Sequence, residues 1–263
     1  LAKNQQKLAG LDEQAQRISA EADNLELRVK VLRDAQPLAT PAAASPERER
    51  ARAAAARALL SQARLLCLST RLLEPKRDSV SQQLAVIDGL EVAVGREATV
   101  DLNAATQVRS ACLKELTLVR RPQLLAAPAE GLTDTLLEAL TKTEKFHAFR
   151  DDRGVVVVLR DVLTAQGTPT SSGAEQLEAL ARVAKAHPKF PLLVVTHSAS
   201  PSNTASAAGP RDLEALVGFL KDKGAPSVQG HAAGDAQPVA PPKRPGARER
   251  NTRVELVFVS PSS

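Results

Sequence analysis

Residues 192–212 read LLVVTHSASPSNTASAAGPRD, a short apolar run that ends in His197 and passes into small, mostly uncharged residues. An apolar run of this length is typical of a buried strand, and the residues after it are typical of a loop. An amphipathic helix follows and ends at Gly224. Its apolar side consists of Leu213, Leu216, Val217 and Leu220. The stretch therefore predicts a buried strand, a loop and a covering helix.

The rest of the C-terminal half repeats this alternation. The stretches GVVVVLRDVL (154–163) and PSVQGHA (226–232) predict strands, and residues 170–187 have the pattern of an amphipathic helix. In the last strand, TRVELVFV (252–259), the alternation predicts one packed face and one partly wet face. The order strand, helix, strand, helix, strand, strand predicts a βαβαββ sandwich with helices over a mixed sheet.

The first 36 residues have the clearest periodicity in the chain. Pro37 ends this segment, which predicts a coiled-coil helix over residues 1–36. The seam residues are Leu8, Leu11, Ala15, Ile18, Ala22, Leu25, Val29 and Leu32. In a parallel homodimer, two of the facing pairs would carry like charges, namely Glu21 with Glu26 and Arg28 with Arg33. The pair of Lys7 with Asp12 favours that dimer, but the balance favours packing against helices of the same chain or an antiparallel pair.

Further helical stretches precede the strands. The first covers residues 45–74, the second begins at Asp78 or Ser79, and the third covers residues 101–120. A short helix is predicted for TDTLLEALTKTEKF (133–146). The chain as a whole is therefore predicted to be α+β, with an antiparallel helical bundle or coiled coil before the sandwich.

The predicted domains are a helical bundle over residues 1–121, a connecting segment over residues 122–144 and the sandwich over residues 145–263. If the first and last bundle helices lie side by side, Cys67 and Cys112 can meet. They would then form a disulfide in an oxidising compartment or remain two buried free thiols.

Composition excludes several classes of function. The chain has a net charge of +5, only five Phe and neither Trp nor Tyr, so it lacks the aromatic platforms and the concentrated basic face of a nucleic-acid binder. No apolar run approaches the length of about 18 residues that a membrane span needs, and no secretory signal is present. We therefore expect a mature or excised piece whose anchor has been removed.

Four stretches, in order, resemble the OmpA-like C-terminal domain, the periplasmic peptidoglycan-associating module shared by OmpA, Pal and MotB. They are DDRGVVVVLRDVLTAQGTPTSSGAEQLEALARV (151–183), LLVVTHSA (192–199), RDLEALVGFLKDKGAPSVQGHAAGD (211–235) and ERNTRVELVF (249–258). The helical half resembles, more weakly, a helical domain of unknown function that precedes such modules in outer-membrane lipoproteins. The resemblance implies an oxidising periplasm, which favours the disulfide between Cys67 and Cys112.

The resemblance also implies a ligand site. The family holds the diaminopimelate of a peptidoglycan stem peptide with the aspartate of a G-H-T-D motif and the second arginine of an R-R-A motif. Here the aspartate position is Ala199 and the arginine position is Asp212. Arg211 lies one position away, about 100° round the helix, and could reach in as a substitute, but the amine of a stem peptide would still lack its carboxylate partner. The resemblance therefore implies a degenerate peptidoglycan site, to which we assign His197, Ser198, Ala199, Arg211, Asp212 and Arg253.

We expect a non-enzymatic envelope protein without cofactor or metal, in the periplasm of a Gram-negative bacterium and attached to the outer membrane. Its peptidoglycan binding would be weak or lost, it would not bind nucleic acid, and residues 1–36 would allow an oligomer. The alternative is a protein–protein adaptor built from the bundle and a repurposed OmpA-like domain, with another envelope protein as its partner.

Other combinations of residues are weaker. The set His197, Ser198 and Asp212 has the residue types of a nucleophilic triad but lacks a G-x-S-x-G turn. The set His197, His231 and Asp235 has no recognisable metal-ligand spacing. Residues 238–253 are basic and proline-rich, and would contact an anionic glycan, lipopolysaccharide headgroup or acidic partner, or form a solvated loop. The basic residues are Lys243, Arg244, Arg248, Arg250 and Arg253.

Overall fold

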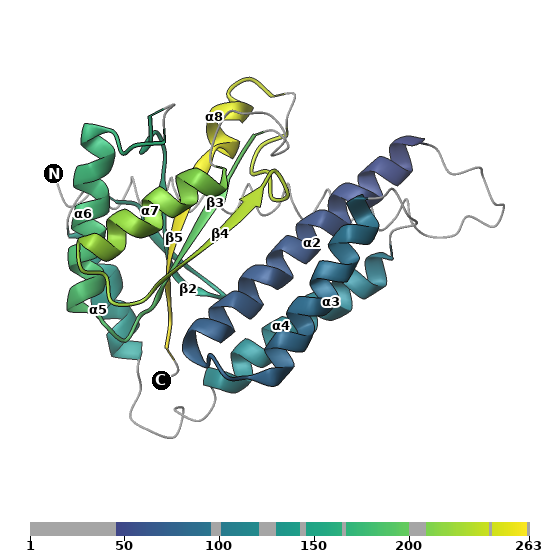
Figure 1. The fold of residues 1–263 in the computed structure, drawn as a ribbon, viewed down its shortest axis with the longest axis horizontal. Helices are drawn as coiled ribbons and strands as arrows, with labels where there is room; N and C mark the ends of the chain where they lie inside the picture. Colours follow the sequence, from purple (N-terminus) through teal and green to yellow (C-terminus); the bar gives the residue numbers. More distant parts are fainter. Residues whose placement is uncertain are drawn as a thin grey trace, which may run out of the picture.

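The structure is a computed structural model that describes residues 46–95, 101–120, 130–142, 146–164, 167–199, 209–241 and 244–261 (Figure 1). The predicted heptad helix of residues 1–36 lies outside these ranges. The helices are α2 (Pro46–Leu73), α3 (Asp78–Gly95), α4 (Leu102–Arg120), α5 (Glu130–Thr141), α6 (Ser171–Ala186), α7 (Pro210–Asp222) and α8 (Ala247–Asn251). The strands are β1 (Ala148–Asp151), β2 (Gly154–Leu159), β3 (Leu192–His197), β4 (Val228–Gly234) and β5 (Arg253–Val259).

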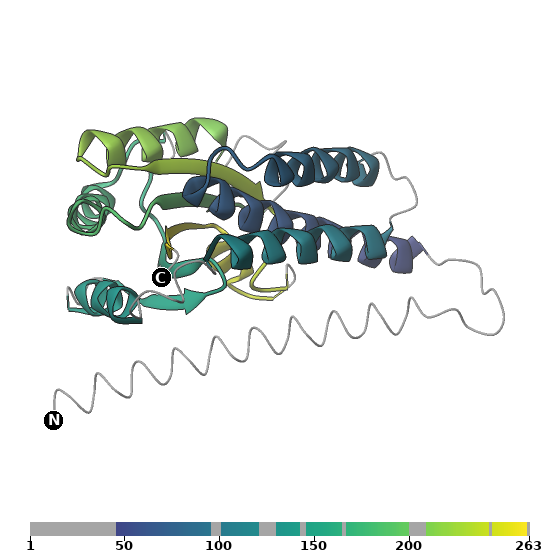
Figure 2. The same ribbon diagram turned by 90° about the horizontal axis from the view of Figure 1, so that it is seen from below.

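The helices α2, α3 and α4 lie side by side as a three-helix bundle (Figures 1 and 2). Pro46 begins α2, at a position where a missing N–H costs little. Asp101 accepts hydrogen bonds from the backbone N–H groups of Asn103 and Ala104 and so caps the start of α4. The helix α3 continues through Gly89 and ends at Gly95. The caps and the prolines therefore place these helices close to the predicted ranges.

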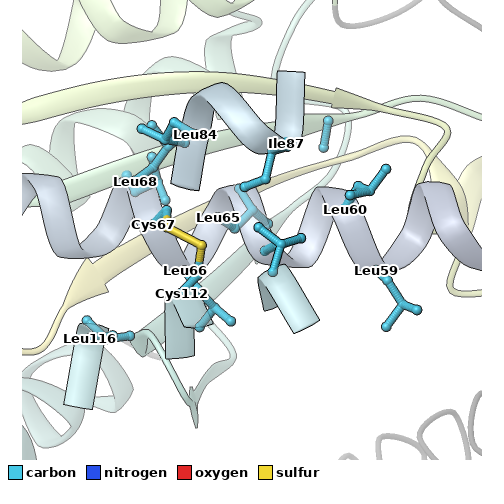
Figure 3. Packing of buried hydrophobic residues seen from close by; sticks show 14 of the residues in the cluster. Leu59, Leu60, Leu65, Leu66, Cys67, Leu68, Leu84, Ile87, Cys112 and Leu116 are labelled. Atoms are coloured by element: carbon cyan, nitrogen blue, oxygen red, sulfur yellow. A yellow bond between two sulfur atoms is a disulfide. The ribbon is translucent and has the colours of Figure 1, made fainter. Parts of the chain in front are cut away.

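The core of the bundle contains a covalent link. Cys67 of α2 and Cys112 of α4 form a disulfide, with a Cα–Cα distance of 5.0 Å (Figure 3). Both cysteines are completely buried. The apolar side chains around them include Leu60, Leu65, Leu66, Leu68, Leu84, Ile87 and Leu116. Of the two states considered from the sequence, this structure has the disulfide.

The five strands form one mixed sheet in the order β1-β2-β5-β3-β4. The pairs are antiparallel except β3 with β4, which is parallel. The sequence did not predict β1, a four-residue edge strand that forms a hairpin with β2. Gly154 follows the hairpin turn with φ of +147°, and a Cβ there would lie 2.1 Å from the carbonyl oxygen of Phe258. Only glycine therefore fits at this position, where the first residue of β2 pairs with the end of β5.

Helices cover both faces of the sheet, with α5, α6 and α7 on one side and the bundle on the other (Figure 1). Along β5, Val254, Leu256 and Phe258 join the core beneath α6 and α7. Val257 and Val259 face the opposite way and join the core of the bundle. All seven residues of β5 are buried, so the predicted partly wet face of this strand was wrong. The side chains that exclude water there come from helices far earlier in the chain.

The bundle and the sheet thus share one core, in which Leu60 and Cys67 belong to the same cluster as Val156 and Val195. Polar contacts join the same two layers. Arg120, at the end of α4, donates hydrogen bonds to the carbonyl oxygens of Asp152, Arg153 and Ser260. The bundle is therefore one layer of a three-layer structure. The division of the chain into three predicted domains stays a prediction.

Candidate functional site

The predicted site begins where β3 ends and β5 starts. His197 and Arg253 are direct neighbours in the antiparallel register of these strands. Both belong to the row of β3 and β5 residues that faces the bundle, because Val195 and Val257 in the same alternating rows pack there. His197 is completely buried and Arg253 is 5% exposed. Neither side chain is therefore available at the surface of the protein.

Glu255 holds this pair together and was not predicted as a site residue. Its Oε1 atom lies 2.9 Å from Nη2 of Arg253 and 3.2 Å from Nε2 of His197. Its Oε2 atom lies 3.1 Å from Nη2 of Arg153, which also contacts Asp151 at 2.5 Å. The signal in the sequence was a glutamate among the apolar residues that follow Arg253 in β5, and the predicted partly wet face accounted for a charge at that position. We call these five residues the sheet charge cluster.

The pKa shifts of Glu255 and His197 follow from these contacts and from burial. Burial alone would raise the pKa of Glu255, but contact with His197 and the charges of Arg253 and Arg153 lower it well below its usual range. Burial, together with the charge of Arg253, lowers the pKa of His197. The cluster therefore contains an ionised glutamate between two guanidinium groups. Within the part of the chain that the structure describes, Nη1 of Arg153 and Nδ1 of His197 are buried without a hydrogen-bond partner.

His231 lies on the same face, on β4, opposite Val195 in the parallel register. Burial, with smaller effects from the charges of Arg64 and His197, lowers its pKa to about 4. A histidine whose folded pKa is lower than its unfolded pKa of about 6.5 stabilises the fold above pH 6.5. That contribution is lost as the pH falls from about 6.5 to about 4. The packing of the bundle against the sheet should therefore become less stable in acid.

We expect the free energy of unfolding to fall by up to about 3 kcal/mol between pH 6.5 and pH 4 because of His231 alone, since one pKa unit is worth about 1.4 kcal/mol. Urea unfolding at a series of pH values measures this. The His231→Gln variant should have a flatter profile in that window. The exposed His147→Gln variant is the matched control, and an equal flattening in both variants would contradict the assignment.

The remaining predicted residues lie elsewhere. Asp212 is in the first turn of α7, where a carboxylate suits the helix dipole. A Cβ on Gly167 would lie 2.5 Å from its Oδ1 atom, so the carboxylate rests against that loop. Arg211 is exposed, and α7 covers the sheet face opposite to the bundle. Ser198, which is buried, donates its backbone N–H to the carbonyl oxygen of Gly234. Ala199 is the last described residue before the gap at residues 200–208.

The structure therefore separates the predicted set into two groups on opposite faces of the sheet. His197 and Arg253 lie on the bundle face, and Arg211 and Asp212 lie on the helix over the other face. The triad considered from the sequence is divided in the same way, since its histidine and aspartate belong to different groups. Within the described residues, no group of three His, Cys, Asp or Glu side chains is arranged to hold a metal ion.

The described part of the basic stretch of residues 238–253 contains a short helix. Part of it forms α8, from which Arg248 and Arg250 are exposed. Asn251 is buried and fastens the preceding loop, because it accepts hydrogen bonds from the backbone N–H groups of Val239 and Ala240 and donates one to the carbonyl oxygen of Ala240. Lys243 lies outside the described residues, and Arg244 is exposed.

The solved structures that are similar to this chain include the following three. A MotB-like protein from Desulfovibrio vulgaris is 14% identical, with 49% of this chain and 95% of that chain covered and a TM-score of 0.40. The cell wall anchor of the T6SS from Pseudomonas aeruginosa is 20% identical, with 49% and 97% covered and a TM-score of 0.39. An OmpA-like domain from Francisella tularensis is 14% identical, with 45% and 83% covered and a TM-score of 0.31.

No protein-family model matches the chain, and no curated protein matches it. Among the helices of the described residues, none has the length and apolar character of a membrane span.

Proposed function

We propose that this chain is a non-enzymatic protein of the bacterial cell envelope, with a degenerate OmpA-like module. Its two peptidoglycan-binding positions, Ala199 and Asp212, which we call the clasp, lack the family's aspartate and arginine. The protein faces the periplasm of a Gram-negative bacterium and is held at the outer membrane, as a lipoprotein would be. It contributes to the attachment or organisation of the envelope. The order of the four OmpA-like stretches supports the family, and the strand order of the sheet is compatible with it.

The observation that carries the loss of binding is the pair of residues at the clasp positions. A zwitterionic ligand such as diaminopimelate needs one fixed anion and one fixed cation. Ala199 offers neither, and Asp212 puts a negative charge where the family has an arginine. Arg253 does not replace that arginine, because it is buried and bound to Glu255. Two charge-assisted hydrogen bonds, each worth about 1.5–3 kcal/mol, are therefore missing from the site.

Retention on purified peptidoglycan sacculi tests the proposal. The unaltered protein should be retained no better than a protein of similar charge, because its clasp lacks the two charges. The Ala199→Asp, Asp212→Arg variant should bind at least tenfold more tightly, and free diaminopimelate should compete with it. The Ala199→Asn, Asp212→Gln variant is the matched control without charges. Strong retention of the unaltered protein that diaminopimelate displaces would overturn the proposal.

A further inference from the structure

The helix α3 has an exposed outer face that is largely apolar, in addition to the inner face that packs into the bundle. Its inner face packs into the bundle through Val80, Leu84 and Ile87. On its outer face, Val86 is 48% exposed and Val92 is 52% exposed. The residues that share this outer face are Gln82, Ala85, Val86, Gly89, Val92 and Ala93. None of these six residues is charged, and a contiguous exposed apolar face of this kind marks a surface at which another element packs.

The acidic residues of α3 lie at the end or along the edge of this outer face. Asp78 is exposed in the first turn, at the N-terminal end of the face. Asp88 and Glu91 are turned toward α2, where Arg64 contacts them at 2.5 Å and 2.8 Å. They lie along one edge of the outer face, and the guanidinium group binds both. The middle of the face therefore offers only apolar groups and one amide to a neighbour. Its small residues, Ala85 and Gly89, allow the backbone of a second helix to come close.

The sequence contains a segment with the complementary property. Residues 8–32 carry a heptad seam of leucine, isoleucine, valine and alanine, and a seam of this kind needs a partner helix. Ala15 and Ala22 make the middle of the seam small, which suits close contact with the small residues of α3. The seam is about 36 Å long and α3, with 18 residues, is about 27 Å long, so the seam can cover it from end to end.

The connection to α2 is long enough for contact within one chain. Residues 37–45 span at most about 30 Å. Pro46 lies about 27 Å along α2 from Arg64, and the end of α3 extends about 6 Å beyond the residues that Arg64 binds. The end of the seam must therefore bridge only about 20 Å to reach the end of α3. The seam would run parallel to α3 and antiparallel to α2.

We propose that residues 8–32 pack against the outer face of α3 in the same chain and complete a four-helix bundle. A partner in the same chain is favoured over a second copy for two reasons. Like charges face each other in the parallel homodimer of this segment, at Glu21 with Glu26 and Arg28 with Arg33. The short connection also gives the segment a high effective concentration at α3.

Hydrogen exchange of the full chain, followed by mass spectrometry at several protein concentrations, tests this assignment. Residues 8–32 should be protected at every concentration, and sedimentation should show a monomer. The Val86→Glu, Val92→Glu variant should exchange at least tenfold faster over residues 8–32, with unchanged exchange in α2 and α4. Leu132→Glu, on α5, is the matched control, because Leu132 is 41% exposed and lies away from α3.

A reciprocal variant covers the case in which the α3 variant fails to fold. Ala15→Glu with Ala22→Glu should leave the described fold intact and make the backbone of α3 exchange faster. Exchange of residues 8–32 at the rate of an unfolded peptide in the unaltered protein would overturn the proposal. So would protection that the α3 variant leaves unchanged, or protection that develops only as the chain dimerises, which would assign the face to a second copy.

Discussion

The Glu255→Gln variant is expected to lose about 3–5 kcal/mol of unfolding free energy, the largest effect of any single substitution considered for this protein. The carboxylate lies between Arg253 and Arg153, and both guanidinium groups are shielded from water by the bundle. Its amide replacement leaves Arg253 with no carboxylate, while Arg153 keeps only Asp151. An uncompensated charge at this depth is far more costly than the loss of the pair as a whole.

Urea unfolding at pH 7 measures the loss of unfolding free energy. Two further variants show whether the loss comes from the buried ion pair. Glu175→Gln changes an exposed carboxylate on α6 and should cost less than about 0.5 kcal/mol. The Arg253→Gln, Glu255→Gln double variant should be more stable than Glu255→Gln alone. In the double variant Arg253, which Glu255→Gln leaves without a carboxylate, is no longer charged. If the double variant is as unstable as the sum of the single variants, Glu255 and Arg253 are not coupled and the cluster is not held as described.

Loss of the disulfide should cost about 4 kcal/mol, the value that chain entropy assigns to a loop closed over a separation of 45 residues. The bond joins α2 to α4 in the middle of the core that the bundle shares with the sheet. Loss of the disulfide should therefore weaken both the bundle and its packing against the sheet. The measurement is urea unfolding with and without a reductant, which needs prolonged incubation because both sulfur atoms are buried.

The Cys67→Ala, Cys112→Ala variant serves as the control for the reductant. It should be as unstable as the reduced protein, and a reductant should not change it further. Quantitative alkylation of both thiols in protein unfolded without a reductant would contradict the disulfide. The same experiment separates the two alternatives that the cysteines left open in the sequence.

The helices and most strands could be predicted because their signals are local. Prolines and cap residues mark the ends of α2 and α4, and apolar periodicity marks α6 and α7. The dense β-branched run from Val155 to Val158 has no other reasonable interpretation than a strand. The edge strand β1 was missed, since AFRD is too short to show an alternation and forms only against β2.

The candidate site was predictable only as a list of positions. Sequence motifs located Ala199 and Asp212. These two residue types alone indicate that the clasp lacks the family's aspartate and arginine. They did not reveal that His197 and Arg253 point away from α7 or that Glu255 binds both. Register across an antiparallel pair decides which residues meet, and it is set by contacts between distant segments.

The amino-acid sequence by itself determined the class and the chain order of the described elements other than β1 and α8, and the absence of charge at Ala199. Each of these depends on residues near one another in the chain. Only the tertiary structure decided that the bundle covers the second face of the sheet. That packing places Glu255 out of water, where it stays ionised because Arg253 and Arg153 are folded against it. A buried charge contributes to the stability of a fold only when segments distant in the sequence exclude water and supply its partners. No local sequence pattern identifies those segments.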